Sequence, residues 1–287
     1  MPELPEVEAL VRFLDDRCTG ATVQRCQLAS ISALKTFDPP LEALEGQPVK
    51  GWQRHGKYLA MDADGLWLVL NLARGGWVTW WDTPPRGTVR LGGRGPLGLR
   101  VSLDGGHGFD VTEMGTEKRL AVWVVRHPDE VEGIATLGPE PLDAAFDRQA
   151  LAGILAAEKG TVKNALSRQS AVAGIGNAYS DEILHAARLS PFKPAASLSD
   201  EELDRLFRAV HEVLTEAVER AVGLGASELK GDKKRSMRVH GRTGHPCQVC
   251  GDTVREVSFA TRSLQYCPTC QTGGKPLADR RLSRLVK

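Results

Sequence analysis

Two short cysteine pairs decide the fold of the C-terminal part of the chain: Cys247-Gln248-Val249-Cys250 and, sixteen residues later, Cys267-Pro268-Thr269-Cys270. This spacing is typical of a structural zinc ribbon, in which two hairpin knuckles each supply two thiolates to one tetrahedral Zn2+. Because segments this short bury little apolar surface, the metal closes a loop that packing alone could not hold. We therefore predict one structural Zn2+ on these four cysteines. A cation, Arg262, precedes the second pair; it suggests a nucleic-acid contact, although zinc ribbons also serve only as structure.

The length and the polar N-terminus limit the class of protein. The 287 residues are enough for about two domains with a sizeable core. No run of about 18 apolar residues is present, so we expect neither a membrane span nor a signal peptide. We therefore expect the protein to be cytoplasmic. In that compartment Cys18 and Cys26 are expected to be reduced thiols.

Charge is unevenly distributed along the chain. Residues 223–287 contain 13 lysines and arginines against 5 aspartates and glutamates, whereas residues 1–222 contain 24 against 31. A basic end on an acidic body favours a polyanionic partner such as a nucleic acid. A solvated charged tail would have the same composition, so charge alone leaves both interpretations open.

Hydrophobic periodicity divides the chain into a β-rich part and a helical part. Apolar residues at helical spacing predict one amphipathic helix from Glu6 to Arg17. From Ala21 to about Arg126, short β-rich runs alternate with glycine and proline, which predicts an antiparallel sandwich or barrel. Further helices are expected at Arg148–Glu158, Val162–Ser167, Asn177–Ala187 and Asp200–Ala221, the last with a capping box of Ser199 and Glu202. The basic segment Gly223–His245 is expected to be mobile.

A glycine turn precedes the helix predicted at Asn177. In the segment Ala173-Gly174-Ile175-Gly176-Asn177, backbone N–H groups at a helix start can bind a phosphate, with the Asn177 amide as an additional donor. Such turns are common, so this motif gains weight only in combination with others.

The N-terminus offers a nucleophile. Pro2 follows Met1, and a small second residue normally allows the initiator methionine to be removed. The secondary amine of Pro2 would then have a pKa near the α-amino range of about 7.7–8.0. Its attack on a sugar C1′ gives a cationic iminium, which is an electron sink for elimination of the phosphates. Glu3 is adjacent and could protonate the opening sugar. Taken alone, Met-Pro-Glu also fits an ordinary start of a chain.

Four segments together resemble the formamidopyrimidine-DNA glycosylase / endonuclease VIII family of base-excision-repair enzymes. Met1–Glu8 resembles the family's N-terminus, and His55–Leu59 resembles the segment that bears its catalytic lysine. Ala173–Glu182 is similar to its helix-two-turn-helix, and the cysteine pairs with Arg262 are similar to its zinc finger. The segments follow the order of the family and span the whole chain.

The resemblance implies a catalytic role for each matching residue near the N-terminus. Pro2 would be the Schiff-base nucleophile and Glu3 the general acid/base. Glu6 would support the hydrogen bonds of the active site, and Lys57 would bind a phosphate beside the lesion. The enzyme would cut the N-glycosidic bond and then nick the strand by β,δ-elimination.

The resemblance also implies a DNA-binding surface. Asn177, with the backbone of Gly176, and Arg262 would hold the backbone beside the lesion from two sides, which kinks the duplex and lets the damaged nucleotide flip out. The partner would be damaged double-stranded DNA, bound by a monomer associated with the nucleoid. Zn2+ is the single cofactor expected.

The sequence departs from the family pattern at two loops. Where family members carry a methionine that fills the emptied base stack, this chain has Arg74, which could stack through its guanidinium plane. The second loop aligns with Thr116–Ala121, where Lys118 and Arg119 would contact DNA. Leu120 replaces an intercalating aromatic residue there, and we expect it to offer an apolar wedge.

A third departure concerns the substrate. The segment from Gly223 to Pro246 is shorter than in the formamidopyrimidine branch and contains no Phe, Trp or Tyr. In the family this region covers a flipped 8-oxoguanine. We therefore expect oxidised pyrimidines, formamidopyrimidines, hydantoins or abasic sites as substrates, rather than 8-oxoguanine.

These features predict an α+β protein in four parts. Residues 1–132 would form a catalytic β-sandwich domain with the N-terminal helix, and residues 133–145 a linker. Residues 146–240 would form the helical helix-two-turn-helix domain, and residues 241–287 a zinc-finger β-hairpin and a basic tail. DNA is expected in the cleft between the two halves.

Two other functions fit part of the sequence. A non-catalytic binder of damaged or abasic DNA would use Asn177, Arg262 and the basic tail, but it would not need the N-terminal residues or Lys57. A zinc-ribbon protein of the transcription or translation apparatus would leave the N-terminal motif unexplained.

Overall fold

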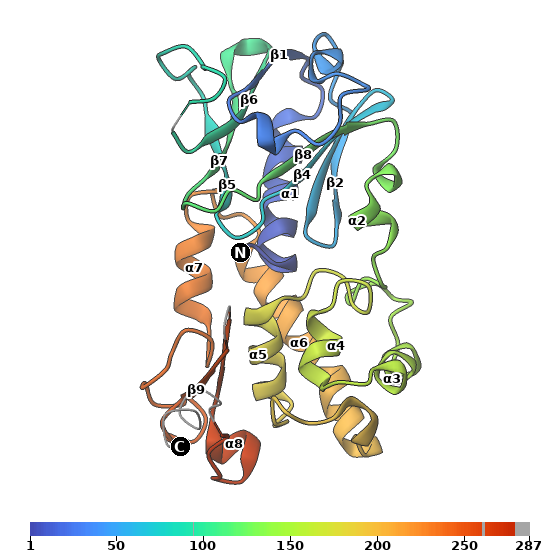
Figure 1. The fold of residues 1–287 in the computed structure, drawn as a ribbon, viewed down its shortest axis with the longest axis vertical. Helices are drawn as coiled ribbons and strands as arrows, with labels where there is room; N and C mark the ends of the chain where they lie inside the picture. The colour runs from blue at the N-terminus through green and yellow to red at the C-terminus, as the bar shows by residue number, and fades with distance from the viewer. Residues whose placement is uncertain (94, 260–261, 279–287) are drawn as a thin grey trace. The chain divides into compact units, whose positions relative to one another are not determined.

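The computed structural model describes residues 1–93, 95–259 and 262–278, and its elements are shown in Figure 1. The chain forms two compact units. The first comprises residues 1–137 and 220–229, and the second comprises residues 138–219 and the chain from residue 230 onward. Among the described residues, no helix is both long and apolar enough to cross a membrane.

The first unit contains the predicted β-sandwich. Its two four-stranded antiparallel sheets have the orders β1-β6-β7-β5 and β2-β3-β4-β8. The strands are β1 (Val23–Leu28), β2 (Gly51–His55), β3 (Tyr58–Ala63), β4 (Leu66–Asn71), β5 (Gly76–Trp81), β6 (Leu97–Leu103), β7 (Gly108–Glu113) and β8 (Ala121–Val125). Buried side chains from both sheets, such as Leu70 and Val101, join one core. The prediction of an antiparallel sandwich or barrel from the short β-rich runs is thus confirmed in its sandwich form.

Helix α1 (Leu4–Cys18) packs into the core of this unit. Val7, Leu10 and Leu14 lie on one face at helical spacing and are fully buried. Pro5 is tolerated in the first turn because its missing N–H would have no partner in the helix. Figure 1 shows α1 in blue beside the strands. The prediction of a helix was confirmed, and the helix extends two residues further toward the N-terminus than predicted.

The segment after the long helix α6 (Asp200–Ala221) returns to the first unit. The indole Nε1 of Trp77 donates to the carbonyl of Ala226 at 2.7 Å, and Leu229 is buried in the sandwich core. Helix α7 (Leu229–Ser236) follows. The expectation of a mobile segment over residues 223–245 was therefore wrong, because residues 226 and 229 bury apolar side chains and residues 229–236 are helical.

Polar side chains cap the starts of helices α3 (Arg148–Ala157), α4 (Val162–Ser167) and α6 in the second unit. Asp147 caps α3 and Thr161 caps α4. At the start of α6, the Ser199 N–H donates to Glu202 and the Glu202 N–H donates to the Ser199 hydroxyl, which confirms the predicted capping box. Helix α5 (Asn177–Ala186) begins after Gly176, which has no side chain to cap it.

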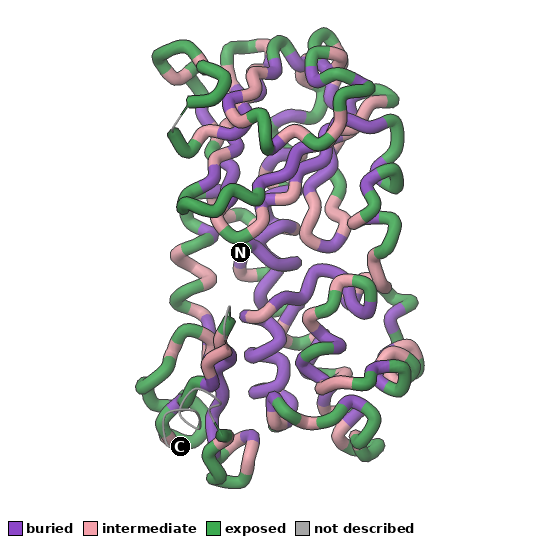
Figure 2. The backbone as a smooth tube through the Cα atoms, viewed as in Figure 1, coloured by how far each residue is buried: buried purple, intermediate pink, exposed green. Residues whose placement is uncertain are grey.

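The C-terminal part of the second unit carries the cysteines. Strands β9 (Arg255–Ser258) and β10 (Ser263–Tyr266) form an antiparallel hairpin, and α8 (Pro268–Thr272) follows. Two small apolar clusters lie in this region, one of them including Cys247 and Cys267 themselves. Figure 2 shows the buried backbone stretches of both units in purple. The short helices not yet named are α2 (Glu132–Ala135) and the 3-10 turns Ile31–Ala33, Leu41–Leu44, Asp104–Gly106, Pro128–Glu130 and Ala195–Ser197.

Candidate active site and zinc centre

The start of α1 brings three of the predicted catalytic residues together. Pro2, Glu3 and Glu6 are all buried. Glu3 is the N-cap of the helix, and its backbone N–H donates to Glu6 Oε2 at 2.9 Å. The Glu6 carboxylate therefore fixes the backbone of the residue that follows Pro2. Two carboxyl groups thus lie within one helical turn of the proline.

Lys57 lies in the two-residue loop Gly56-Lys57 between β2 and β3. Gly56 adopts a φ of +53°, which suits a glycine at the first position of a hairpin loop. Arg54 ties this loop to helix α1. Its Nε donates to Glu8 Oε2 at 2.8 Å and its Nη1 donates to the Gly56 carbonyl at 3.1 Å. The loop that carries Lys57 is thereby fixed to the helix that begins beside Pro2.

The Arg54–Glu8 pair is mostly shielded from water. The two side chains are 11% and 21% exposed. Burial opposes ionisation of Glu8, but hydrogen bonds from Arg54 and Arg12 outweigh it and hold the pKa of Glu8 below its ordinary value. Glu8 is therefore a carboxylate at neutral pH. The two residues are 46 positions apart, so local sequence patterns do not reveal the pair.

Two loops of the first unit carry the other candidate DNA contacts. Arg74, Lys118 and Arg119 are exposed. The loops are adjacent, because the N–H of Met114 donates to the Gly75 carbonyl at 3.0 Å. The Glu113 carboxylate fixes the second loop by accepting the N–H groups of Arg119 at 2.7 Å and of the next residue at 3.0 Å. Arg74, Lys118 and Arg119 thus lie on two loops that a backbone hydrogen bond joins.

The prediction that Leu120 offers an apolar wedge was wrong. Leu120 is only 3% exposed and belongs to the sandwich core, where its side chain occupies the space beside Gly98. In the same loop Met114 is 65% exposed. Sequence reasoning missed Met114, although a methionine just after a strand and before a polar loop was a visible signal.

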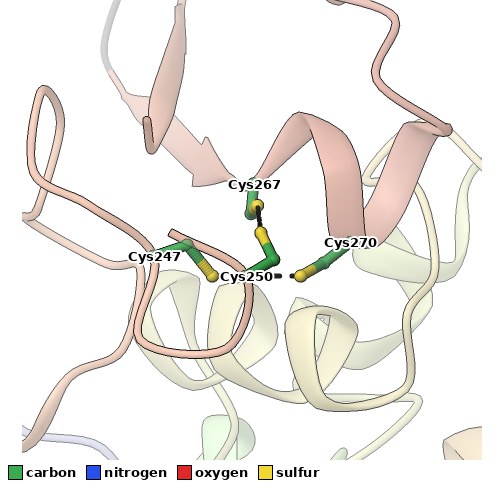
Figure 3. A group of neighbouring side chains, drawn as sticks. All are labelled: Cys247, Cys250, Cys267 and Cys270. Atoms are coloured by element: carbon green, nitrogen blue, oxygen red, sulfur yellow. Dashed lines mark hydrogen bonds between the residues drawn. The ribbon is translucent and has the colours of Figure 1, made fainter. Parts of the chain in front are cut away.

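The four cysteines form a site that fits one Zn2+. Their sulfur atoms lie within 4.8 Å of one another, with 3.9 Å between Cys247 and Cys270 and 3.3 Å between Cys250 and Cys267 (Figure 3). A tetrahedral zinc with Zn–S bonds of about 2.3 Å requires S···S distances of about 3.8 Å. The predicted zinc ligands are therefore brought together by the fold.

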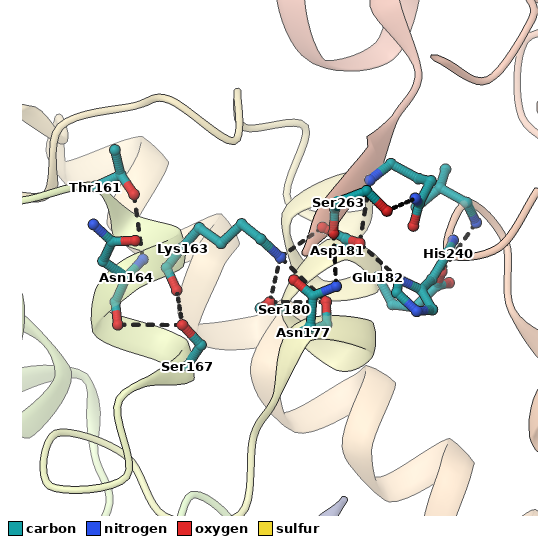
Figure 4. Close-up of polar contacts among 12 residues, drawn as sticks. Thr161, Lys163, Asn164, Ser167, Asn177, Ser180, Asp181, Glu182, His240 and Ser263 are labelled. Carbon is teal, nitrogen blue, oxygen red and sulfur yellow. Dashed lines mark hydrogen bonds and ion pairs between the residues drawn. The ribbon is translucent and has the colours of Figure 1, made fainter. Parts of the chain in front are cut away.

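Asn177 and Arg262 lie near each other in the second unit. The Asn177 amide nitrogen donates to the carbonyl of Ser263, the residue after Arg262, at 2.8 Å (Figure 4). Both residues border a cavity of about 550 Å³, which is also lined by Phe192 and Phe259. Gly176 is the extended N-cap of α5. The glycine turn and the zinc hairpin therefore present their polar groups to a common space.

A buried ion pair lies beneath this surface. Lys163 Nζ is 2.6 Å from Asp181 Oδ1 and 2.7 Å from the Ser180 hydroxyl, and both charged side chains are shielded (Figure 4). Asp181 Oδ2 also contacts His240 Nδ1 at 2.8 Å and accepts the N–H of Gln265 at 3.2 Å. The carboxylate thus joins α4, α5 and β10. Sequence reasoning missed this pair, whose signal was a lysine within the otherwise apolar face of α4.

Three family models match the chain in order. The N-terminal domain of formamidopyrimidine-DNA glycosylase matches residues 1–107, and its helix-two-turn-helix domain matches residues 137–227. A zinc finger found in formamidopyrimidine-DNA glycosylase and isoleucyl-tRNA synthetase matches residues 244–273. The chain belongs to the formamidopyrimidine-DNA glycosylase family.

Individual relatives agree with this assignment. The chain is 35% identical to formamidopyrimidine-DNA glycosylase of Moorella thermoacetica over 269 residues, which cover 90% of this chain and 94% of the relative. It is 60% identical over 151 residues to a formamidopyrimidine-DNA glycosylase-like protein of Mycobacterium tuberculosis, covering 53% of this chain and 94% of that protein. The solved complex of Lactococcus lactis Fpg with DNA containing an abasic site is similar with a TM-score of 0.81 and 25% identity, over 94% of this chain and 99% of that one.

Membership fixes the general activity. Enzymes of the formamidopyrimidine-DNA glycosylase family are DNA glycosylases of base-excision repair, and this chain contains all three of the family's parts. The zinc-finger match and the four clustered sulfur atoms together assign one structural Zn2+ to the protein.

Proposed function

We propose that the chain binds damaged double-stranded DNA and acts on it as a bifunctional glycosylase and abasic-site lyase through Pro2. The observation that carries this proposal is the start of α1, where Glu3 and Glu6 follow Pro2 within one helical turn and Arg54 joins the Lys57 loop to the same helix. A protein that only bound damaged DNA would not need a buried pair of carboxyl groups beside its N-terminal proline.

The reaction follows from these groups. After removal of Met1, the neutral Pro2 amine attacks C1′ of the damaged nucleotide as the base leaves. Glu3, held at the N-cap, protonates the opening sugar. The resulting iminium withdraws electrons, so loss of the C2′ proton expels the 3′ phosphate, and loss of the C4′ proton then expels the 5′ phosphate. Lys57 binds one of these phosphates while the charge on it increases.

The second unit supplies further contacts with the DNA backbone. Asn177, Gly176 and Arg262 border or adjoin one cavity, so that a single phosphate backbone can contact all three. The similar Lactococcus lactis protein was solved with abasic DNA, which supports this assignment. In this proposal residues 1–132 supply the chemistry, residues 133–145 are the linker, and residues 146–240 and 241–287 bind DNA. One chain supplies every group, so a monomer acting on nucleoid DNA in the cytoplasm is sufficient.

Met114 and Arg74 are the side chains proposed to fill the base stack. Met114 is exposed and its backbone is bonded to the Arg74 loop, whereas Leu120 is part of the core. Lys118 and Arg119 lie on the same loop and would contact phosphates. Substitution M114A should reduce the fluorescence increase of a 2-aminopurine placed opposite an abasic site, while L120A should act mainly on stability. Equal fluorescence changes for wild type and M114A would contradict this role.

Oxidised pyrimidines, formamidopyrimidines and abasic sites are the proposed substrates. The chain from residue 223 to 246 has no aromatic residue, and part of it is committed to the sandwich core through Ala226 and Leu229. Little of it remains to cover a flipped 8-oxoguanine. Single-turnover excision should be much faster on thymine glycol than on 8-oxoguanine, and comparably fast rates would reject this substrate class.

Product analysis separates the enzyme from a non-catalytic binder. On an end-labelled duplex with one abasic site, β,δ-elimination leaves phosphates at both ends of a one-nucleotide gap. Wild type should yield this product, and K57A should yield less of it while still binding the duplex. A mobility shift without strand cleavage would favour the non-catalytic alternative.

A further inference from the structure

One face of α5 and the turn after it contact the zinc finger segment, which we define as residues 238–259 and 262–278. The contacts recur every four residues, the spacing at which helical side chains share a face. They run from Asn177 to Ser263, from Asp181 to Gln265 and His240, from His185 to Cys247, and from the Leu189 carbonyl to Gln271. The zinc finger segment therefore packs along a single face of α5 and the turn after it.

The contact of His185 reaches a zinc ligand. His185 is 3% exposed, and its Nε2 lies 3.3 Å from Cys247 Sγ. A zinc-bound cysteine is a thiolate and can only accept a hydrogen bond, so the Nε2–H must be the donor. The other ring nitrogen, Nδ1, is buried and has no hydrogen-bond partner among the described residues. This environment favours the neutral tautomer with its proton on Nε2.

We propose that His185 is a positioning residue of the zinc centre, which donates Nε2–H to the Cys247 thiolate and thereby retards loss of zinc. Four thiolates around Zn2+ leave a net charge of −2, and Cys247 is a buried member that contacts α5 through His185. An N–H donor in this shielded setting stabilises the charge and orients the ligand. Within the knuckle, the N–H of Val249 gives Cys247 a second, longer contact of 3.5 Å.

This role has a consequence for the surface that carries Asn177. His185 and Asn177 lie two turns apart on the same helix. Helix α5 therefore contacts the hairpin through the Asn177–Ser263 bond and contacts the zinc centre through the His185–Cys247 bond. Both contacts hold the zinc finger segment against the same helix. The inference concerns the metal centre, so it stands whether or not Pro2 is the nucleophile.

The test is the rate of zinc transfer from the purified full-length protein to a chromophoric chelator. H185F removes the donor and keeps a ring, H185Q restores an N–H donor, and H211Q is the control. His211 lies in α6, where its ring packs against Phe146 and Phe207. We expect H185F to lose zinc about 10-fold faster, with partial recovery in H185Q and the wild-type rate in H211Q. A wild-type rate in H185F would overturn the proposal.

A second measurement covers the case in which H185F folds poorly. In the Co2+-substituted protein, wild type and H185Q should both give the spectrum of a four-sulfur site, and the sulfur-to-cobalt band should shift in H185F. A three-sulfur, one-nitrogen spectrum in wild type would overturn the proposal, because His185 would then be a ligand itself.

Discussion

The start of α1 and the zinc finger segment both present candidate site residues, but they are held in different ways. Helix α1 buries Val7, Leu10 and Leu14 in the core shared by both sheets of the sandwich. The zinc finger segment has only small clusters, one of which includes its own metal ligands. Apolar burial therefore positions Pro2, whereas a metal and a polar contact face position Arg262.

The difference also appears in the polar contacts. In the first unit one ion pair, Arg54–Glu8, sets the position of a single loop relative to a helix that is already packed. In the second unit Asp181 and Glu182 together make five polar contacts with residues before and within the hairpin. Where little apolar surface is available, hydrogen bonds to buried carboxylates hold the segments together.

Removal of zinc should have the largest effect. Zinc binding contributes about 10–16 kcal/mol in isolated zinc-finger peptides, far more than the small clusters here can supply. After chelation, amide hydrogen exchange of β9 and β10 should become fast, while that of β3 and β4 remains slow. Retained protection of β9 and β10 in the zinc-free protein would show that packing alone holds the hairpin.

Substitution D181N should have the next largest effect. It leaves Lys163 charged and buried without its partner, which costs about 3–5 kcal/mol. The control is D204N, because Asp204 pairs with Arg148 at the surface and should change stability by less than about 1 kcal/mol. Urea unfolding measures both, and equal free energies of unfolding for the two variants would contradict the importance of the buried pair.

Substitution E8Q should have a smaller effect on stability and a specific effect on catalysis. Loss of the charged hydrogen bonds to Arg54 and Arg12 should cost about 1.5–3 kcal/mol, and the displaced Lys57 loop should slow strand cleavage about 10-fold. D64N, which alters the exposed Lys50–Asp64 pair, is the control. Cleavage by E8Q at the rate of D64N would show that the pair does not position Lys57.

The contribution of Glu8 should depend on pH. Its pKa is lowered by folding, so its stabilisation is fully present above the unfolded value of about 4.3 and is lost as pH falls through the folded value. The stability difference between wild type and E8Q should therefore be present at pH 7 and shrink below about pH 4. A difference that stayed constant to pH 3 would argue against an ion pair.

Local patterns predicted much of the fold and of the site. Helices α1, α3, α4, α5 and α6, the sandwich and the zinc ligands followed from local spacing, as did the capping box at Ser199. The contacts Arg54–Glu8, Lys163–Asp181 and His185–Cys247 did not, because their partners are 46, 18 and 62 residues apart. Leu120 was misassigned for the same reason, since its burial depends on the space beside Gly98.

The most direct test of the account is chemical trapping of Pro2 on DNA. The protein is incubated with a duplex that contains one abasic site in the presence of sodium borohydride, and the wild type is compared with a form whose N-terminus is blocked by an uncleaved tag. The account predicts a covalent protein–DNA adduct for the wild type alone. Tight binding without an adduct, or equal adduct formation by the blocked form, would contradict it.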